Sequence, residues 1–212
     1  MNKDEFLEEL KKINIILNKE QMEQLDKYYK LLVCWNQKIN LTRIIDENEV
    51  YLKHFYDSLT LTKVVDLSQN ITLCDIGTGA GFPGIVLKIV FPSLSITLVD
   101  ALLKRVKFLN IVIEELNLKD IVAIHARAED FIKANSNRFD VVTCRAVSRL
   151  NNLITYCVPL LKENGVFLPM KANCDEEINE IKGKKVIITK VEKFVLPIEN
   201  SNRTIIEIRK KK

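Results

Sequence analysis

The sequence has no apolar run approaching the roughly 18 residues that a membrane-spanning helix requires. Asp4 and Glu5 stand where a secretory signal peptide would carry only positive charge. We therefore expect a soluble, cytoplasmic protein with no membrane partner.

Cysteine is present but lacks the spacing that marks a metal or redox site. The chain has five cysteines, and none forms a Cys-x-x-Cys pair. They are Cys34, Cys74, Cys144, Cys157 and Cys174. We expect reduced, mostly buried thiols and no bound metal.

A strong bias toward one sign of charge is also missing. The formal net charge is +4 over 212 residues. This value permits a polyanionic partner but falls short of the basic bias of a protein that coats DNA. The length allows one sizeable hydrophobic core and is too short for two ordinary domains. Internal repeats are absent as well, so we expect one domain with an appendage, acting as a monomer.

Hydrophobic periodicity divides the chain near residue 65. Before this point, apolar residues recur every three or four positions, which is the period of amphipathic helices. Helices are predicted over residues 4–17, after a capping box at Asn18 and Gln21, and after a second box at Asp46 and Glu49. We expect residues 1–65 to form a helical extension packed on the core, and residues 66–212 to form one compact main domain.

After residue 70, short β-branched runs alternate with helical segments. This alternation predicts parallel strands joined by right-handed crossovers. The predicted strands are 71–76, 95–100, 121–125, 139–144 and 165–170, and the predicted helices are 84–91, 104–118, 129–134, 151–161 and 175–181. Two further strand-like segments, 185–195 and 203–209, are separated only by a loop and must be antiparallel. The pattern predicts a Rossmann-like α/β sheet of seven strands with a reversed last hairpin.

The first predicted strand leads into a glycine-rich turn. Four of the six glycines of the chain fall between Gly77 and Gly84. A turn between a strand and a helix is where nucleotide cofactors bind, because glycine lets the backbone turn tightly and a ligand approach it closely. We therefore expect a cofactor site here rather than a tight turn without a ligand.

The identity of the cofactor is the harder question, since these glycines also fit the dinucleotide pattern G-x-G-x-x-G. Asp100 ends the second predicted strand and would bind a ribose in either case. Asp75, two residues before Gly77, matches the acidic-x-Gly-x-Gly-x-Gly signature of methyltransferases, in which the acid helps to position the methionine end of S-adenosylmethionine. The paired last strands also fit the reversed terminal hairpin of the Rossmann-like methyltransferase sheet, whereas a nicotinamide-dependent oxidoreductase of this size would still need a substrate domain. That oxidoreductase and a non-catalytic RNA-binding factor stay open as alternatives.

Successive blocks of the chain resemble the small-subunit ribosomal RNA guanine-N7 methyltransferases, also called glucose-inhibited division protein B. The main blocks are WNQKINLT at 35–42, HFYDSL at 54–59 and DIGTGAGFPG at 75–84. Further matches follow at 98–100, 104–109, 126–129 and 144–150, so the resemblance covers nearly the whole chain. It implies S-adenosyl-L-methionine as the cofactor. It also implies methyl transfer to N7 of one guanine in the decoding region of 16S rRNA, within the small ribosomal subunit.

The resemblance also implies a set of cofactor contacts. Carried over residue by residue, these contacts fall on Gly77, Phe82, Ala128, Glu129 and Arg145. Phe82 stands where the family often has leucine, and either residue offers apolar contact. The loop and ribose arguments add Asp75, Gly79, Gly81 and Asp100 to the expected cofactor site.

Methylation at N7 of guanine needs no base, because this atom already carries an in-plane lone pair. Catalysis should come from holding N7 in line with the methyl group and from excluding water. We therefore assign no catalytic residue, and take Arg145, Lys171 and His54 as positioning candidates. Arg145 and Lys171 follow the fourth and fifth predicted strands, at the edge where α/β proteins bind ligands. Arg145 could serve the cofactor or an RNA phosphate. For Lys171, and for Arg149 nearby, a solvated surface position is an equal alternative.

His54 and Asp57 lie three positions apart on a predicted helix, close enough for a hydrogen bond. The pair either ties the helical extension to the sheet or serves the target guanine, and the sequence does not separate the two. Cys144 is better explained as a buried thiol than as a covalent nucleophile, because free cysteine is among the most buried residue types. The basic run Lys104, Arg105 and Lys107 is better explained as a solvated helix face than as a phosphate site.

Overall fold

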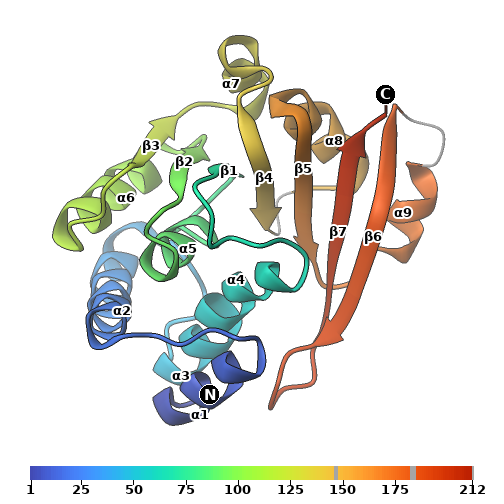
Figure 1. The fold of residues 1–212 in the computed structure, drawn as a ribbon. Coiled ribbons are helices and arrows are strands. Elements are labelled where there is room, and N and C mark those ends of the chain that lie inside the picture. The colour runs from blue at the N-terminus through green and yellow to red at the C-terminus, as the bar shows by residue number, and fades with distance from the viewer. Residues whose placement is uncertain (146–147, 182–184, 212) are drawn as a thin grey trace.

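The computed structural model describes residues 1–145, 148–181 and 185–211. A seven-stranded sheet in the order β3-β2-β1-β4-β5-β7-β6 forms its centre (Figure 1). The strands are β1 Thr72–Ile76, β2 Ser95–Asp100, β3 Ile121–His125, β4 Phe139–Arg145, β5 Leu161–Lys171, β6 Val186–Val195 and β7 Asn202–Lys210. Strands β1 to β5 pair in parallel, and β7 lies between β5 and β6 and runs antiparallel to both. The predicted seven-stranded sheet with a reversed last hairpin is therefore confirmed.

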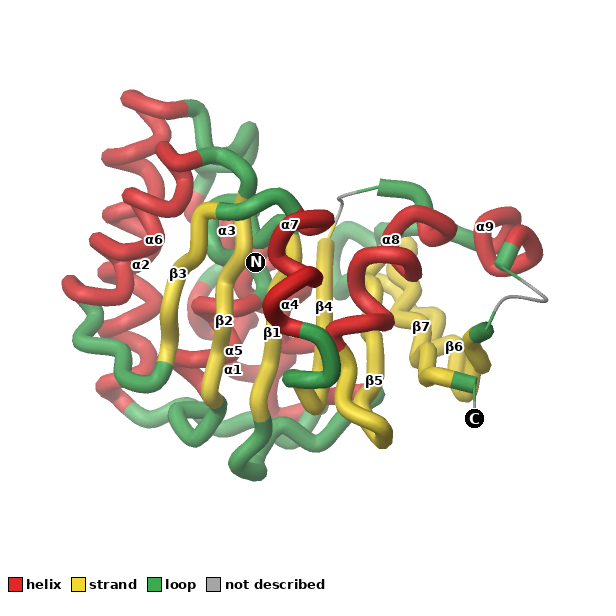
Figure 2. Tube along the Cα trace, turned by 90° about the horizontal axis from the view of Figure 1, so that it is seen from above, coloured by secondary structure: helices red, strands yellow, loops and turns green. Residues whose placement is uncertain are grey.

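Helices cover both faces of this sheet. After β1 they are α5 Gly84–Val90, α6 Leu103–Glu115, α7 Ala128–Asn135, α8 Leu150–Cys157 and α9 Asp175–Glu180. Successive residues of a strand point to opposite faces, so Leu73 and Val141 lie in one hydrophobic cluster and Cys74 and Val142 in another. Figure 2 shows α8 in front of the sheet and α5 behind it. Strands β1, β2, β4 and β5 are thus largely buried on both sides, as parallel strands usually are, whereas β3 and β6 at the two edges are more exposed.

The first third of the chain is helical. It comprises α1 Lys3–Lys12, α2 Lys19–Ile39, α3 Glu47–Val50, a π-helix at Tyr51–Tyr56, α4 Asp57–Leu59 and a 3₁₀ turn at Thr60–Lys63. The capping box at Asn18 and Gln21 is confirmed, with reciprocal bonds of 2.8 and 2.9 Å. The second predicted box forms only in part. Asp46 caps the N–H of Glu49 at 3.1 Å, whereas the Glu49 carboxylate pairs with Lys53 at 2.7 Å.

Two predicted helices extend four or five residues too far, and each error has a local cause. The helix predicted over 4–17 ends at Lys12, because Asn14 adopts a left-handed backbone conformation with φ of 60°. The helix predicted over 151–161 ends at Cys157. Pro159 follows in a short 3₁₀ turn, and proline cannot continue an α-helix. Strand β5 then begins at Leu161, four residues before the predicted start at 165.

The N-terminal helices share one hydrophobic cluster with the sheet. Phe6 and Tyr28 are fully buried in the same cluster as Leu73 and Leu98 of the strands. The side-chain amide of Gln21 donates to the carbonyls of Ile89 and Val90 at 3.1 and 3.0 Å, where α5 ends. Such carbonyls lack partners within their own helix. The N-terminal helices thus pack against the sheet. The division of the chain into an extension, 1–65, and a main domain, 66–212, stays a prediction. In the described ranges, no helix combines the length and apolar character needed to cross a membrane.

Candidate active site

The loop after β1 has a backbone that favours glycine. Gly77, Gly79 and Gly81 have φ values of 69°, 62° and 102°, a region that other residues rarely adopt. A Cβ atom at Gly81 would lie 2.7 Å from the Tyr28 hydroxyl oxygen. The N–H groups of Gly77 and Thr78 both donate to the carbonyl of Val99, at 2.8 and 3.1 Å. The loop is therefore fixed against the end of β2.

Asp75 lies beneath this loop and is fully buried. Its Oδ2 accepts hydrogen bonds from the Thr78 hydroxyl at 2.7 Å and from the Gly84 N–H at 2.9 Å. Its Oδ1 is buried and has no hydrogen-bond partner among the described residues. Burial raises the pKa of Asp75 from 3.8 to about 6, although the two hydrogen bonds and the charge of Arg145 favour the ionised form. The site thus holds one unused acceptor next to the glycine loop.

Asp100 ends β2 beside the same loop and is almost fully buried. Its carboxylate accepts from the N–H groups of Gly79 at 2.9 Å and Leu102 at 2.8 Å, and from Arg105 at 3.3 Å. Arg105, expected on a solvated helix face, therefore also contacts this carboxylate. The Asp100 carbonyl accepts from Ala126 at 3.2 Å. This bond lies just before Ala128 and Glu129, which begin α7.

Phe82 connects the glycine loop to two of the predicted positioning residues. The His54 ring stacks on the Phe82 ring with centroids 4.3 Å apart and planes 21° apart. The Arg145 guanidinium lies 5.2 Å from the same ring centroid, a distance typical of cation–π contacts. His54, from the π-helix, and Arg145, from the end of β4, therefore meet over the loop.

His54 is a neutral imidazole in this setting. Its Nδ1 lies 3.0 Å from Arg145 Nη2, and its Nε2 lies 3.1 Å from Thr42 Oγ1. The Nδ1 atom also lies 3.1 Å from the Lys53 carbonyl oxygen, so it faces both the Arg145 donor and a backbone acceptor. Burial, and after it the charge of Arg145, lowers the pKa of His54 to about 3. Both ring nitrogens are engaged within the protein.

The Asp57 carboxylate does not bond to the His54 ring, contrary to the sequence-based expectation of a hydrogen bond between the side chains, and only the Asp57 backbone N–H donates to the His54 carbonyl. Arg145 bridges the two, because its Nη1 lies 3.0 Å from Asp57 Oδ2 and donates to the Lys53 carbonyl at 2.8 Å. The other Asp57 oxygen accepts from Arg203 Nε at 3.0 Å. These contacts tie the helical extension to β4 and β7, which is one of the two roles that the sequence left open.

A cavity of about 660 Å³ opens beside this cluster. Its basic lining residues are Lys53, Arg145, Arg149, Lys171 and Arg203, against the acidic Asp57 and Glu177. Lys171 is held by Glu177 at 2.7 Å and by the Ser148 carbonyl at 2.7 Å. His54, Arg145 and Lys171, predicted separately from sequence, therefore line one cavity. Sequence reasoning missed Arg203, which no local motif marks and which lies 146 residues from Asp57 in the chain.

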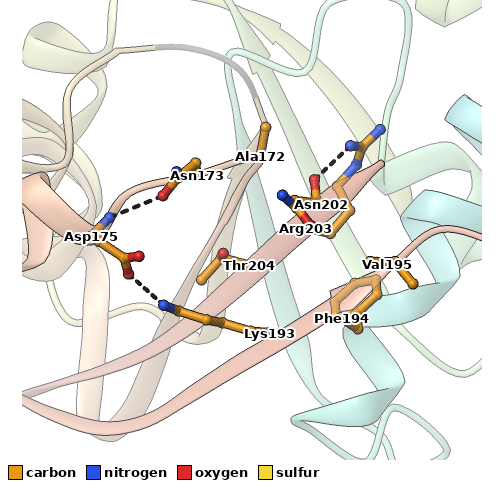
Figure 3. A pocket seen from close by; sticks show the side chains of 9 residues that line it. All are labelled: Ala172, Asn173, Asp175, Lys193, Phe194, Val195, Asn202, Arg203 and Thr204. Carbon is orange, nitrogen blue, oxygen red and sulfur yellow. Dashed lines mark hydrogen bonds and ion pairs between the residues drawn. The ribbon is translucent and has the colours of Figure 1, made fainter. Parts of the chain in front are cut away.

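A second cavity of about 430 Å³ adjoins the first (Figure 3). It lies between the loop after β5 and the ends of β6 and β7 where their connection begins. Ala172, Asn173 and Arg203 line both cavities. The two cavities are therefore neighbours that share these three residues as a common wall.

Cys144 lies away from these cavities. It is 1% exposed and packs in the cluster beneath α7 and α8, with its thiol in contact with that of Cys157. Cys74, Cys157 and Cys174 are also buried, whereas Cys34 is exposed. The expectation of mostly buried thiols is confirmed.

Comparison with known proteins agrees with this geometry. The family model described as rRNA small subunit methyltransferase G matches residues 21–206. The protein named Ribosomal RNA small subunit methyltransferase G from Bacillus subtilis (strain 168) is 48% identical over 219 residues, spanning 99% of this chain and 91% of its own. The protein of the same name from Oceanobacillus iheyensis is 48% identical over 220 residues, spanning 100% of this chain and 92% of its own.

Solved structures show the same fold at low sequence identity. A SAM-dependent methyltransferase from Aquifex aeolicus is similar with a TM-score of 0.57 and 16% identity, covering 77% of this chain and 93% of its own. P. horikoshii TYW2 in complex with MeSAdo has a TM-score of 0.57 and 15% identity, covering 74% of this chain and 62% of its own. The expected Rossmann-like methyltransferase fold is confirmed, and the oxidoreductase alternative is set aside. The chain belongs to the rRNA small subunit methyltransferase G family of S-adenosylmethionine-dependent methyltransferases.

Proposed function

We propose that this protein transfers the methyl group of S-adenosyl-L-methionine to N7 of one guanine in the 16S rRNA of the small ribosomal subunit. The observation that carries the proposal is the contact of Phe82 with His54 and Arg145. Phe82 belongs to the glycine loop, and the other two residues line the cationic cavity of about 660 Å³. A cofactor on the loop and an RNA base in the cavity would therefore be neighbours.

The residues around the loop suit S-adenosylmethionine. The unpartnered Oδ1 of Asp75 offers a buried acceptor for the ammonium of its methionine part, and a buried acceptor gains from such a donor. Asp100, at the end of β2, suits the ribose hydroxyls, and Gly77, Gly79 and Gly81 allow close approach of the backbone. Ala128, Glu129, Phe82 and Arg145 are the further contacts that family resemblance implies. When bound, the cofactor supplies an electrophilic methyl group on a sulfonium.

The cavity suits an RNA base and its phosphates. Five basic side chains and two acidic ones line the cavity, and Lys53 and Arg149 also pair with Glu199 and Glu180 outside it. The Arg149 pair is exposed, so a phosphate can replace Glu180 as its partner. A guanine exposes O6 and N7 on one edge, where arginine and lysine commonly bind. N7 must stay open to the methyl group, so we assign the basic side chains to O6 and the phosphates.

Positioning, rather than acid or base catalysis, is the role that these side chains support. The guanine N7 lone pair needs no deprotonation, and the lowered pKa of His54 keeps its ring neutral at neutral pH. Arg145 is fixed by Asp57, His54 and the Lys53 carbonyl. A rigid wall of this kind holds a base in one orientation, which lowers the barrier to an in-line displacement.

The test is transfer of a labelled methyl group from S-adenosylmethionine to unmodified small ribosomal subunits, with the labelled nucleoside identified by mass. Recovery of 7-methylguanosine supports the cofactor, the substrate and the atom together. Absence of transfer despite measurable cofactor binding would refute the proposal and favour a non-catalytic RNA-binding role. Naked 16S rRNA in a parallel reaction identifies whether the substrate is free RNA or the assembled subunit.

Lys171→Met examines the cavity in the same assay. Lys171 lies at the end of β5 in the cavity, whereas Lys162 lies on the same strand and pairs with Asp140 at 2.8 Å outside it. We expect Lys171→Met to reduce kcat/KM for the subunit without changing the affinity for the cofactor. Lys162→Met should leave both quantities unaltered. Equal effects of both variants would remove the cavity from substrate binding.

A further inference from the structure

We propose that the second cavity, of about 430 Å³, binds the nucleotide next to the target guanine. This proposal rests on the proposed function, because it takes the first cavity as the place of the guanine. Ala172, Asn173 and Arg203 line both cavities, so a chain could pass from one to the other without leaving the protein surface. Cavities of this size are typical of small-ligand sites.

The wall of the second cavity has the chemistry that proteins use for single-stranded RNA. Asn173 and Asn202 present side-chain amides, which can both donate to and accept from the edge of a base. Val195 is exposed and adds apolar surface, against which a base can pack, whereas Phe194 packs on the core with Lys63 Nζ 5.3 Å from its ring centroid. Figure 3 shows Asn173 on one side of the cavity and Asn202 on another. A base between them would contact polar groups at its edge and apolar groups at its face.

Lys193 can bind a phosphate with little loss of protein stability. Its Nζ lies 2.6 Å from Asp175, but the two side chains are 56% and 59% exposed. Exposed ion pairs of this kind contribute little to stability. A phosphate can therefore replace Asp175 as the partner of Lys193.

Arg203 lies at the boundary between the two cavities and is held rigidly. Asp57 accepts from its Nε at 3.0 Å, and the Asn202 carbonyl accepts from its Nη1 at 2.8 Å. Its side chain is 20% exposed. A fixed guanidinium suits phosphate oxygens. The position between the two cavities is where the phosphate that joins two successive nucleotides would lie.

The test compares binding and methylation in the double variant Lys193→Met/Asn202→Ala. Both residues are exposed and lie outside the first cavity. The matched control is Lys190→Met, which removes an exposed lysine of the same strand that pairs with Glu192 and does not line the second cavity. Calorimetry with guanosine monophosphate and with guanine-containing dinucleotides measures how much affinity the second nucleotide adds. Steady-state methylation of unmodified small subunits measures KM and kcat.

We expect the second nucleotide to raise the affinity of the unaltered protein at least about fivefold, and this gain to disappear in the double variant. The control should keep the gain. Guanosine monophosphate and S-adenosylmethionine should bind all three proteins equally, and the double variant should raise KM for the subunit at least about fivefold with unchanged kcat.

An equal gain from the second nucleotide in the double variant and the unaltered protein would overturn the proposal, and so would no gain in either. The binding measurement does not depend on methyl transfer. Failure of the proposed function would appear as absent transfer by the unaltered protein. Failure of this inference would appear as the same gain in affinity from the second nucleotide in the double variant and the unaltered protein, or as no gain in either.

Discussion

Asp75 should make the stability of the cofactor-free protein depend on pH. Its carboxyl is fully buried at the end of β1, and burial raises its pKa from 3.8 to about 6. Between these values the folded protein holds a proton that the unfolded chain releases, so the free energy of unfolding falls as pH rises. One pKa unit corresponds to about 1.4 kcal/mol, so the full loss is about 3 kcal/mol. The stabilisation is complete below pH 3.8 and lost above pH 6.

Asp75→Asn isolates this effect. The amide keeps the shape of the carboxyl and can still accept from Thr78 and Gly84, but it does not titrate. Any cost of burying the amide is the same at every pH, and groups elsewhere titrate alike in both proteins. The stability of the variant relative to the unaltered protein should therefore increase by about 2.4 kcal/mol between pH 4 and pH 7.

Urea unfolding of the two cofactor-free proteins at a series of pH values measures this difference. Parallel curves, with a difference constant to within about 0.5 kcal/mol, would refute the assignment of the raised pKa to Asp75. The same pair tests the cofactor role. An ammonium near Oδ1 favours the ionised carboxylate, so S-adenosylmethionine should bind more weakly to the unaltered protein below about pH 6. The variant should bind it at least about tenfold more weakly at pH 7.5.

Three further substitutions test the site. Asp100→Ala should weaken S-adenosylmethionine binding at least tenfold, through loss of about 1.5 to 3 kcal/mol of charged hydrogen bonds; unchanged affinity by calorimetry removes Asp100 from the site. Gly84→Ala should destabilise the fold by about 1 to 3 kcal/mol, because a Cβ atom would overlap the Leu98 side chain and press on Asp75; an unaltered thermal midpoint would contradict this packing. Cys144→Ala should keep methyl transfer within about tenfold, since loss of a covalent nucleophile would cost several orders of magnitude; abolished transfer by a folded variant would restore a covalent role for the cysteine.

The sheet could be predicted because its signals are local. Parallel strands buried on both faces have short β-branched runs, and the predicted span 95–100 coincides with the buried strand β2. The span 121–125 coincides with β3, which lies at the edge of the sheet and is partly exposed. Helix ends were less predictable. The left-handed conformation of Asn14 costs little for asparagine but is not required by it, so the residue type alone did not mark the end of α1.

The sequence by itself determined the glycine loop with Asp75 and Asp100, because a tight turn at the end of a strand restricts which residue types can occupy it. Only the tertiary structure decided which charged groups meet at the cavity. The chain contains many arginines, and Asp57 forms ion pairs with Arg145 and Arg203. That choice depends on β7 lying between β5 and β6 and on the π-helix packing against the end of β4. Both arrangements are set by burial of apolar surface over the whole molecule, and no local pattern around the charged residues records them.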